Sequence, residues 1–126
     1  MPTDKPFPLS RVGLFVVVGI LILLFGFGST PASGNLVPTP WDKAIHVLVF
    51  AALSFCLSAA LPRAALGSVA ALALGIGLAD ELHQYLVPTR QPGFDDWLAD
   101  AAGTFCGLLL WRWQGRRFLN GCACPH

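Results

Sequence analysis

The stretch that decides the fold runs from Leu78 to Gly107 and reads LADELHQYLVPTRQPGFDDWLADAAGTFCG. Apolar runs lie on both sides of it, whereas the stretch itself carries Asp80, Glu81, His83, Gln84, Arg90, Asp95, Asp96 and Asp100. Pro88 and Pro92 interrupt it, and proline breaks a helix because it has no backbone N–H to donate. The stretch therefore predicts the polar end of one helix, a short loop, and the polar start of the next helix.

The composition of the whole chain is that of a membrane protein. Charged residues make up only 12% of the 126 residues and hydrophobic residues 55%, whereas an ordinary soluble domain has roughly 25% charged residues. The mean hydropathy is +0.64. A formal net charge of +1, without a basic stripe interleaved with aromatic residues, excludes the electrostatic footprint of a nucleic-acid-binding protein.

We expect an all-α fold, an integral membrane bundle of four transmembrane helices in a single domain over residues 1–126. The expected helices are about 12–28, 42–61, 64–86 and 94–113. The first run, VGLFVVVGILILLFGFG, has no charge and approaches the length of about 20 residues that crosses a hydrocarbon core. A cleaved signal peptide is its competing interpretation, although the apolar part of such a peptide usually spans only about 7–15 residues.

The positions of lysine and arginine predict the orientation of the bundle. With four crossings both termini lie on one side, together with Lys5, Arg11, Arg63, Arg112, Arg116 and Arg117, whereas only Lys43 and Arg90 lie on the other side. The positive-inside rule then places both termini in the cytoplasm. Trp41, Tyr85 and Trp97 fall at the outer helix ends, where interfacial aromatic anchors are expected.

This topology brings polar residues of three helices to the same outer end. Asp42, Lys43 and His46 begin the second helix, Glu81 and Gln84 end the third, and Asp96 and Asp100 begin the fourth. At 100° per residue we expect three polar faces: Asp42, His46, Phe50 and Leu53; Gly77, Glu81, Gln84 and Tyr85; Asp96, Asp100, Gly103 and Gly107. Because charges at membrane depth normally face a bundle interior or a wet cavity, we predict a shallow polar pocket that opens outward.

The order of these residues resembles the VanZ-like family. The pattern consists of DKxxH at Asp42, Lys43 and His46, ExxQ at Glu81 and Gln84, PxR at Pro88 and Arg90, and DxxxDxxGxxxG at Asp96, Asp100, Gly103 and Gly107. It covers about the last three helices, and the first helix matches in hydropathy only. The resemblance implies a small bacterial protein of the inner (cytoplasmic) membrane, and the family's named member is associated with resistance to the glycopeptide teicoplanin. The family more often has Asn at the place of Asp100.

Two classes of function are open. The first is a binding or accessory protein that recognises an anionic lipid or cell-wall precursor through Asp42, Lys43, Gln84 and Arg90, since a guanidinium suits carboxylate or phosphate. The second is a membrane-embedded hydrolase or transferase acting on a phosphorylated lipid-linked substrate, with His46, Glu81, Asp96 and Asp100 as catalytic candidates. The sequence has no GxSxG, HExxH, Walker or dinucleotide motif. No metal site or cofactor is expected, although a divalent cation is left open.

Several residues also have plainer interpretations. Asp42 can stabilise the helix dipole while Lys43 extends to the lipid headgroups, and Asp96 can cap the fourth helix. Arg90 can be a rim residue near lipid phosphates, and Gly103 and Gly107 form a small-xxx-small motif that predicts close helix packing. We expect Asp95 and His83 to be surface groups, and Cys56 and Cys106 to be small apolar residues within helices. Cys122 and Cys124, with His126, supply too few ligands for a closed zinc site.

Overall fold

The computed structural model describes residues 8–27, 41–88 and 93–121. Across these ranges the chain is helical and contains no strand. The elements are α1 (Pro8–Ile22), a π-helical turn η1 (Leu23–Phe27) that continues it, α3 (Trp41–Ala60), α4 (Leu66–Tyr85) and α5 (Phe94–Gly121). The predicted all-α fold is therefore confirmed.

Three of the helices are long and apolar enough to cross a membrane, judged by length and composition. Among the described residues these spans are Ser10–Phe27, Trp41–Ala60 and Leu66–Tyr85. The helix α5 is not among them, because three aspartates in its first two turns and Arg112 near its other end lower its mean hydropathy. The helical segments agree with a membrane protein, with three such helices where the sequence led us to expect four.

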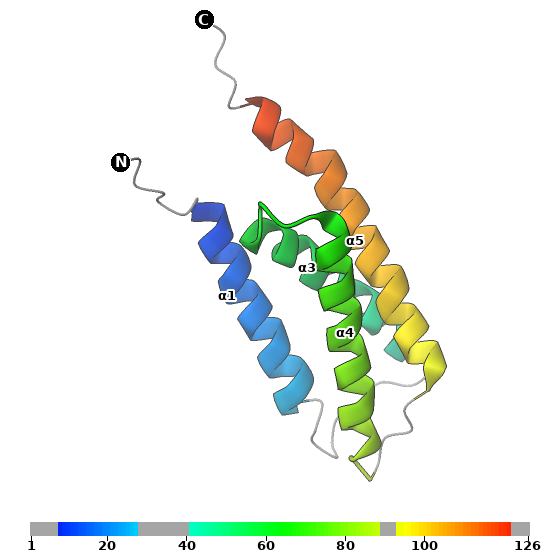
Figure 1. Cartoon of the computed structure of the whole chain (residues 1–126). Coiled ribbons are helices and arrows are strands. Elements are labelled where there is room, and N and C mark those ends of the chain that lie inside the picture. The colour runs from blue at the N-terminus through cyan, green and yellow to red at the C-terminus, as the bar shows by residue number, and fades with distance from the viewer. Residues whose placement is uncertain (1–7, 28–40, 89–92, 122–126) are drawn as a thin grey trace, which may run out of the picture.

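The helix α5 differs most from its expected range. It passes the predicted end at Trp113 and continues to Gly121. Residues 114–121 read QGRRFLNG and include no proline, and a single interior glycine at Gly115 weakens a helix without ending it. The predicted end marked where the apolar run stops, and a helix can extend beyond the apolar part of its own sequence. Its last turns project past the other helices (Figure 1).

The helix α3 occupies the centre of the bundle. It contacts α5 most extensively, then α1, and it also contacts α4. Figure 1 shows that α1 begins and α5 ends at one end of the bundle, while the start of α3, the end of α4 and the start of α5 share the opposite end. We call that opposite end the polar end. The core between the helices consists of Val17, Phe50, Leu53, Leu57, Val69, Ala73 and Leu108.

Glycines allow the helix backbones to approach one another. A Cβ added at Gly103 would overlap the carbonyl group of Val47, and one added at Gly107 would overlap Ser54 Oγ and the carbonyl oxygen of Ala51. Ser54 Oγ also donates a hydrogen bond to the backbone carbonyl of Thr104, at 3.0 Å. The backbones of α3 and α5 are therefore in direct contact along this face, which leaves no space for a larger side chain.

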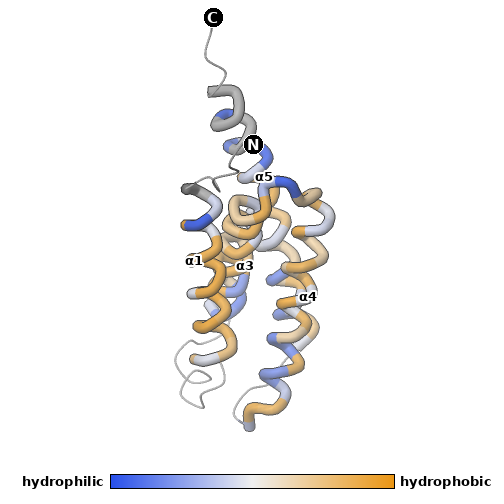
Figure 2. Tube along the Cα trace, turned by 60° about the vertical axis from the view of Figure 1, so that its left-hand side comes forward, coloured by the Kyte–Doolittle hydropathy of each residue, from blue (hydrophilic) through white to orange (hydrophobic). Residues whose placement is uncertain are grey.

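The outer surface of the bundle is apolar. Large exposed side chains include Phe15, Leu48, Leu72, Leu82, Phe105 and Leu109. Figure 2 shows apolar residues along most of the four helices and hydrophilic residues gathered on the half of α3 and α4 that leads to the polar end. In water such an exposed surface would be costly, whereas in a bilayer it faces lipid tails. Free Cys106 is exposed on α5 and Cys56 is half-buried on α3, both within helices as expected.

Candidate functional site

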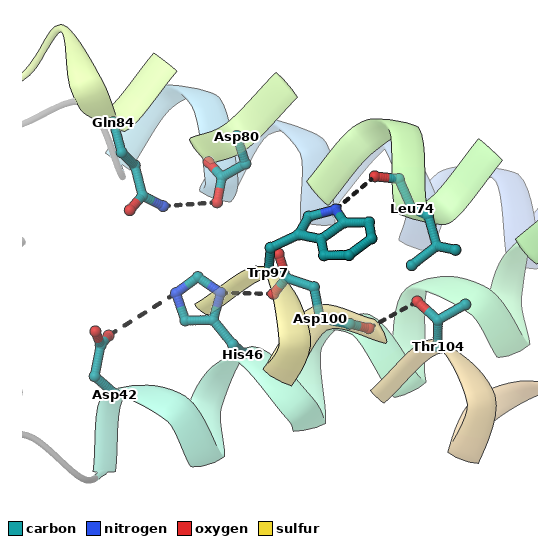
Figure 3. Close-up of polar contacts among 8 residues, drawn as sticks. All are labelled: Asp42, His46, Leu74, Asp80, Gln84, Trp97, Asp100 and Thr104. Carbon is teal, nitrogen blue, oxygen red and sulfur yellow. Dashed lines mark hydrogen bonds and ion pairs between the residues drawn. The ribbon is translucent and has the colours of Figure 1, made fainter. Parts of the chain in front are cut away.

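The centre of the polar end is His46 of α3, which lies between two carboxylates. Its Nδ1 is 2.7 Å from Asp100 Oδ1 of α5, and its Nε2 is 4.0 Å from Asp42 Oδ1, one turn earlier on α3. The His46 side chain is only 7% exposed. Figure 3 shows the imidazole ring between the two acids. Each ring nitrogen therefore faces an acceptor of the protein itself.

Asp100 is fully buried, at 0% exposure, and a glycine makes room for it. A Cβ at Gly77 of α4 would lie 2.9 Å from Asp100 Oδ2 and 3.3 Å from the ring of Phe50. Thr104 Oγ1 donates to the backbone carbonyl of Asp100 at 2.8 Å. Among the residues that the structure describes, Asp100 Oδ2 has no hydrogen-bond partner. The carboxylate thus sits where α3, α4 and α5 meet.

A second polar pair lies on α4 at the same end. Gln84 Nε2 donates to Asp80 Oδ2 at 2.7 Å, and both side chains are buried. The sequence led us to expect Glu81 and Tyr85 on the inner face with Gly77 and Gln84, and this is partly wrong, since Tyr85 is 78% exposed. The buried face of α4 consists of Val69, Ala73, Gly77, Asp80 and Gln84. Val69, Ala73 and Gly77 follow one another at intervals of four, and Asp80 and Gln84 continue this face at intervals of three and then four, as 3.6 residues per turn require.

Four further polar side chains are buried or half-buried between the helices, and sequence reasoning assigned none of them to the network. Two of them, Trp97 and Ser54, donate a hydrogen bond to a neighbouring helix. Trp97 Nε1 donates to the carbonyl of Leu74 at 3.3 Å, so this half-buried tryptophan links α5 to α4 rather than serving only as an interfacial anchor. Ser54, Ser58 and Thr104 are buried as well. Ser54 and Ser58 continue the i+4 row that starts at Asp42, and Thr104 continues the row of Asp96 and Asp100. That spacing was present in the sequence.

A groove of about 380 Å³ lies between the end of α4 and the start of α5. It is lined by Leu78, Glu81, Leu82, Tyr85, Gly93, Phe94 and Trp97. Only Glu81 among the predicted site residues lines it, and Glu81 Oε1 is buried without a hydrogen-bond partner among the described residues. The predicted polar residues therefore do not line this groove together, because His46, Gln84 and Asp100 are buried between the helices.

The other candidate residues that the structure describes are Lys43, His83, Asp95 and Asp96. Lys43 Nζ is 3.3 Å from Asp95 Oδ2, with side chains 44% and 74% exposed, so Asp95 is a surface group as expected. Asp96 lies in the first turn of α5, which begins at Phe94, and not at the N-cap position, and its backbone N–H donates to the carbonyl of Gly93 at 3.0 Å. His83 is not a surface group, since its half-buried ring contacts Phe25 edge to face. Arg90, Cys122 and Cys124 lie outside the described residues.

The sequence of the chain also matches a protein family. The model of the VanZ/LLP1 family matches residues 14–115 of the chain. The chain belongs to the VanZ/LLP1 family. The match extends beyond the last three helices, which carry the recognisable motifs, and includes most of α1. Neither the curated proteins nor the solved structures include one that matches the chain.

The polar end of this VanZ/LLP1 protein is more acidic than basic. Asp42, Asp80, Glu81 and Asp100 accompany His46 there, and Lys43 already contacts Asp95. His46 lies within hydrogen-bond distance of Asp100 alone, and at 4.0 Å from Asp42 its other nitrogen would, if protonated, contribute a charge–charge attraction that offsets part of the acidic charge. Within the described ranges, no group of three or more His, Cys, Asp or Glu side chains is placed to hold a metal ion. The arrangement is suited to fixing helix positions and to presenting a few charges at the surface.

Proposed function

We propose that this VanZ/LLP1 protein acts in the bacterial cell envelope by binding an anionic lipid or envelope intermediate at the polar end of its bundle. The observation that carries the proposal is that three otherwise apolar helices direct buried polar side chains to one end. Burying such groups in a membrane is unfavourable, so they are retained where they hold a site in shape. Asp42, His46, Gln84 and Asp100 have this supporting role.

Recognition of the anion depends on the basic residues at the rim. Lys43 keeps 44% of its side chain exposed, and an exposed ion pair such as Lys43 with Asp95 contributes only about 0–1 kcal/mol. A phosphate or carboxylate can therefore displace Asp95 from the lysine at little cost. Arg90 is the second proposed contact, from the loop before α5. The nearby acids repel anions, so the two basic residues must supply the affinity.

The proposed location is the bacterial inner membrane, with both termini in the cytoplasm and α5 as a fourth crossing. The lysine and arginine distribution supports this orientation. Two features support the crossing of α5: its glycine face packs closely against α3, and its exposed side chains Leu98, Phe105, Leu109 and Leu110 are apolar. The polar residues that lower its hydropathy include Asp100, which is buried inside the bundle.

Enzymatic activity is the second candidate, and the 2.7 Å contact of His46 with Asp100 favours it. A histidine held by a carboxylate is a common general base, but it needs its other nitrogen for the substrate. Here Asp42 faces that nitrogen, which makes a supporting role the better assignment. Release of phosphate from polyprenyl phosphates by the purified protein, with and without divalent cations, tests this candidate. Turnover that is lost in His46→Ala and Glu81→Ala would establish it over the binding role.

The binding proposal is tested with Lys43→Gln, and Arg112→Gln is the matched control with the same loss of charge at the opposite end of the bundle. We expect Lys43→Gln to weaken binding of phosphatidylglycerol to the purified protein, with no change in Arg112→Gln. In bacteria, expression of the wild type should change teicoplanin susceptibility, and Lys43→Gln at equal membrane level should reduce that change. Unaltered lipid binding in Lys43→Gln would refute the proposed site, and an unchanged susceptibility on wild-type expression would refute the antibiotic role.

A further inference from the structure

The groove between α4 and α5 has the composition of a ligand site distinct from the buried network. Its volume of about 380 Å³ falls within the range of small-molecule pockets, roughly 300–1,000 Å³. Its walls are aliphatic or aromatic, formed by Leu78, Leu82, Tyr85, Phe94 and Trp97. Phe94 and Trp97 stack with ring centroids 5.7 Å apart, which gives one side a continuous aromatic surface. Among the described residues that line it, Glu81 is the one carboxylate.

The buried carboxylate oxygen of Glu81 indicates which charge a ligand of the groove should carry. Glu81 Oε1 is buried and has no hydrogen-bond partner among the described residues, as is the case for Asp100 Oδ2, but of these two acids only Glu81 lines the groove. A buried carboxylate oxygen without a donor is unfavourable by about 1–3 kcal/mol, and more when it is charged. Because Glu81 lines the groove, a positively charged group of a ligand there would offset the unfavourable burial of this carboxylate. An anionic group would increase it.

The aromatic residues narrow the choice of cation. Aromatic faces attract organic ammonium groups through the ring quadrupole, and together with a carboxylate they form the usual recognition site for such groups. A divalent metal ion instead needs six or more oxygen ligands for Ca²⁺, or an octahedral set for Mg²⁺. A single carboxylate among aliphatic and aromatic walls does not provide them. The groove is therefore suited to an ammonium group attached to an apolar body.

The surroundings of the groove point to the bilayer as the source of this ligand. Leu78, Leu82, Tyr85 and Phe94 are all more than half exposed, on an outer surface that is otherwise apolar. We propose that the groove binds the ammonium headgroup of an aminated membrane phospholipid at Glu81, with the lipid chains along the aliphatic residues of α4. This site goes beyond the proposed anion recognition by Lys43 and Arg90 and does not depend on it.

The experiment measures binding of phosphatidylethanolamine and phosphatidylglycerol to the full chain in detergent by native mass spectrometry. Glu81→Gln keeps the shape of the side chain and removes its charge. We expect this change to weaken phosphatidylethanolamine binding by about tenfold or more, the effect of losing one charge-assisted hydrogen bond, and to leave phosphatidylglycerol binding unchanged. Tyr85→Ala, at an exposed position that does not support folding, should also weaken phosphatidylethanolamine binding.

Asp95→Asn is the matched control, because it removes one acid at the same end of the bundle but outside the groove. Binding of phosphatidylethanolamine should not weaken in it, because the change leaves Glu81 intact and only frees Lys43 from its ion pair. The proposal is wrong if the wild type does not bind phosphatidylethanolamine, if Glu81→Gln binds it as well as the wild type does, or if Asp95→Asn loses as much affinity as Glu81→Gln. Failure of the anion site is seen separately, as unaltered phosphatidylglycerol binding in Lys43→Gln.

Discussion

Asp100 is the residue on which the buried network depends, because it is fully buried and joins three helices. Its Oδ1 lies 2.7 Å from His46 Nδ1 of α3, and its Oδ2 lies against Gly77 of α4. Asp100→Ala would leave the imidazole without this acceptor. Since removing one member of a buried charged pair costs about 3–5 kcal/mol, we expect a loss of this size in the free energy of unfolding, measured by thermal denaturation in detergent.

Asp100→Asn should lose much less stability, about 1 kcal/mol, because its amide oxygen can still accept the hydrogen bond from His46 Nδ1. This expectation agrees with the resemblance noted above, in which Asn is the more frequent family residue at this place. Asp95→Asn changes an exposed pair and should cost at most about 1 kcal/mol. If alanine and asparagine at position 100 are equally destabilising, the acceptor role of Asp100 is incorrect.

For individual residues, the sequence predicted the polar end of the bundle correctly but identified only some of the polar residues that are buried there. His46 and Asp100 were expected together because both begin helices at the same end and share faces with Phe50 and Gly103. Asp80 was missed in favour of Glu81, since adjacent residues differ by only 100° and the choice depends on how α4 is rotated. That rotation is set by packing, with Ala73 and Gly77 against the neighbouring helices, which the polar residues alone do not reveal.

The contact of α3 with α5 is the tightest in the bundle and gives a prediction for a whole element. Gly103→Ala would place a methyl group against the backbone carbonyl of Val47, which cannot move aside as a flexible side chain would. We expect the two helices to separate and stability to fall by about 1–3 kcal/mol or more, since overpacking forces the backbone to shift. Thermal unfolding in detergent measures the loss.

Gly75→Ala is the matched control for this prediction. Nothing lies within 4 Å of a Cβ at Gly75, and the residue is exposed in the middle of α4. The substitution should be neutral or stabilising by up to about 1 kcal/mol, because alanine is the better helix former. Equal stability of the wild type and Gly103→Ala would contradict the close approach of α3 and α5.

The positions of the helices could be predicted from the sequence because proline and glycine separate the long apolar runs. The predicted start of the last helix, Phe94, coincides with that of α5, since Pro92 precedes it. Its end was predicted too early, because hydropathy reports where a helix could leave a bilayer rather than where its hydrogen bonds stop. Arg117, placed 4.5 Å from the ring centre of Trp113, lies on the extra turns.

For the molecule as a whole, the number of helices that cross the membrane decides on which side of the membrane α5 ends. Among the described residues three helices are apolar enough to span a membrane, whereas the charged residues of α5 lower its hydropathy. One of them, Asp100, is buried inside the bundle and would not face lipid if α5 crosses. If α5 crosses as well, Gln114 lies in the cytoplasm, on the side opposite to Asn35 and to the α4–α5 loop. If α5 does not cross, Gln114 and Asn35 lie on the same side.

Cysteine labelling in intact cells distinguishes the two arrangements. The four native cysteines are first replaced by serine or alanine, and single cysteines are then introduced at Asn35, Pro92 or Gln114. We expect a membrane-impermeant maleimide to label Asn35→Cys and Pro92→Cys from outside, and Gln114→Cys only after permeabilisation, as four crossings with cytoplasmic termini require. Labelling of Gln114→Cys in intact cells would show that α5 does not cross and that the chain has three crossings. Labelling of Asn35→Cys only after permeabilisation would reverse the orientation and place the polar end, with Glu81 and Lys43, toward cytoplasmic lipids instead of the outer leaflet.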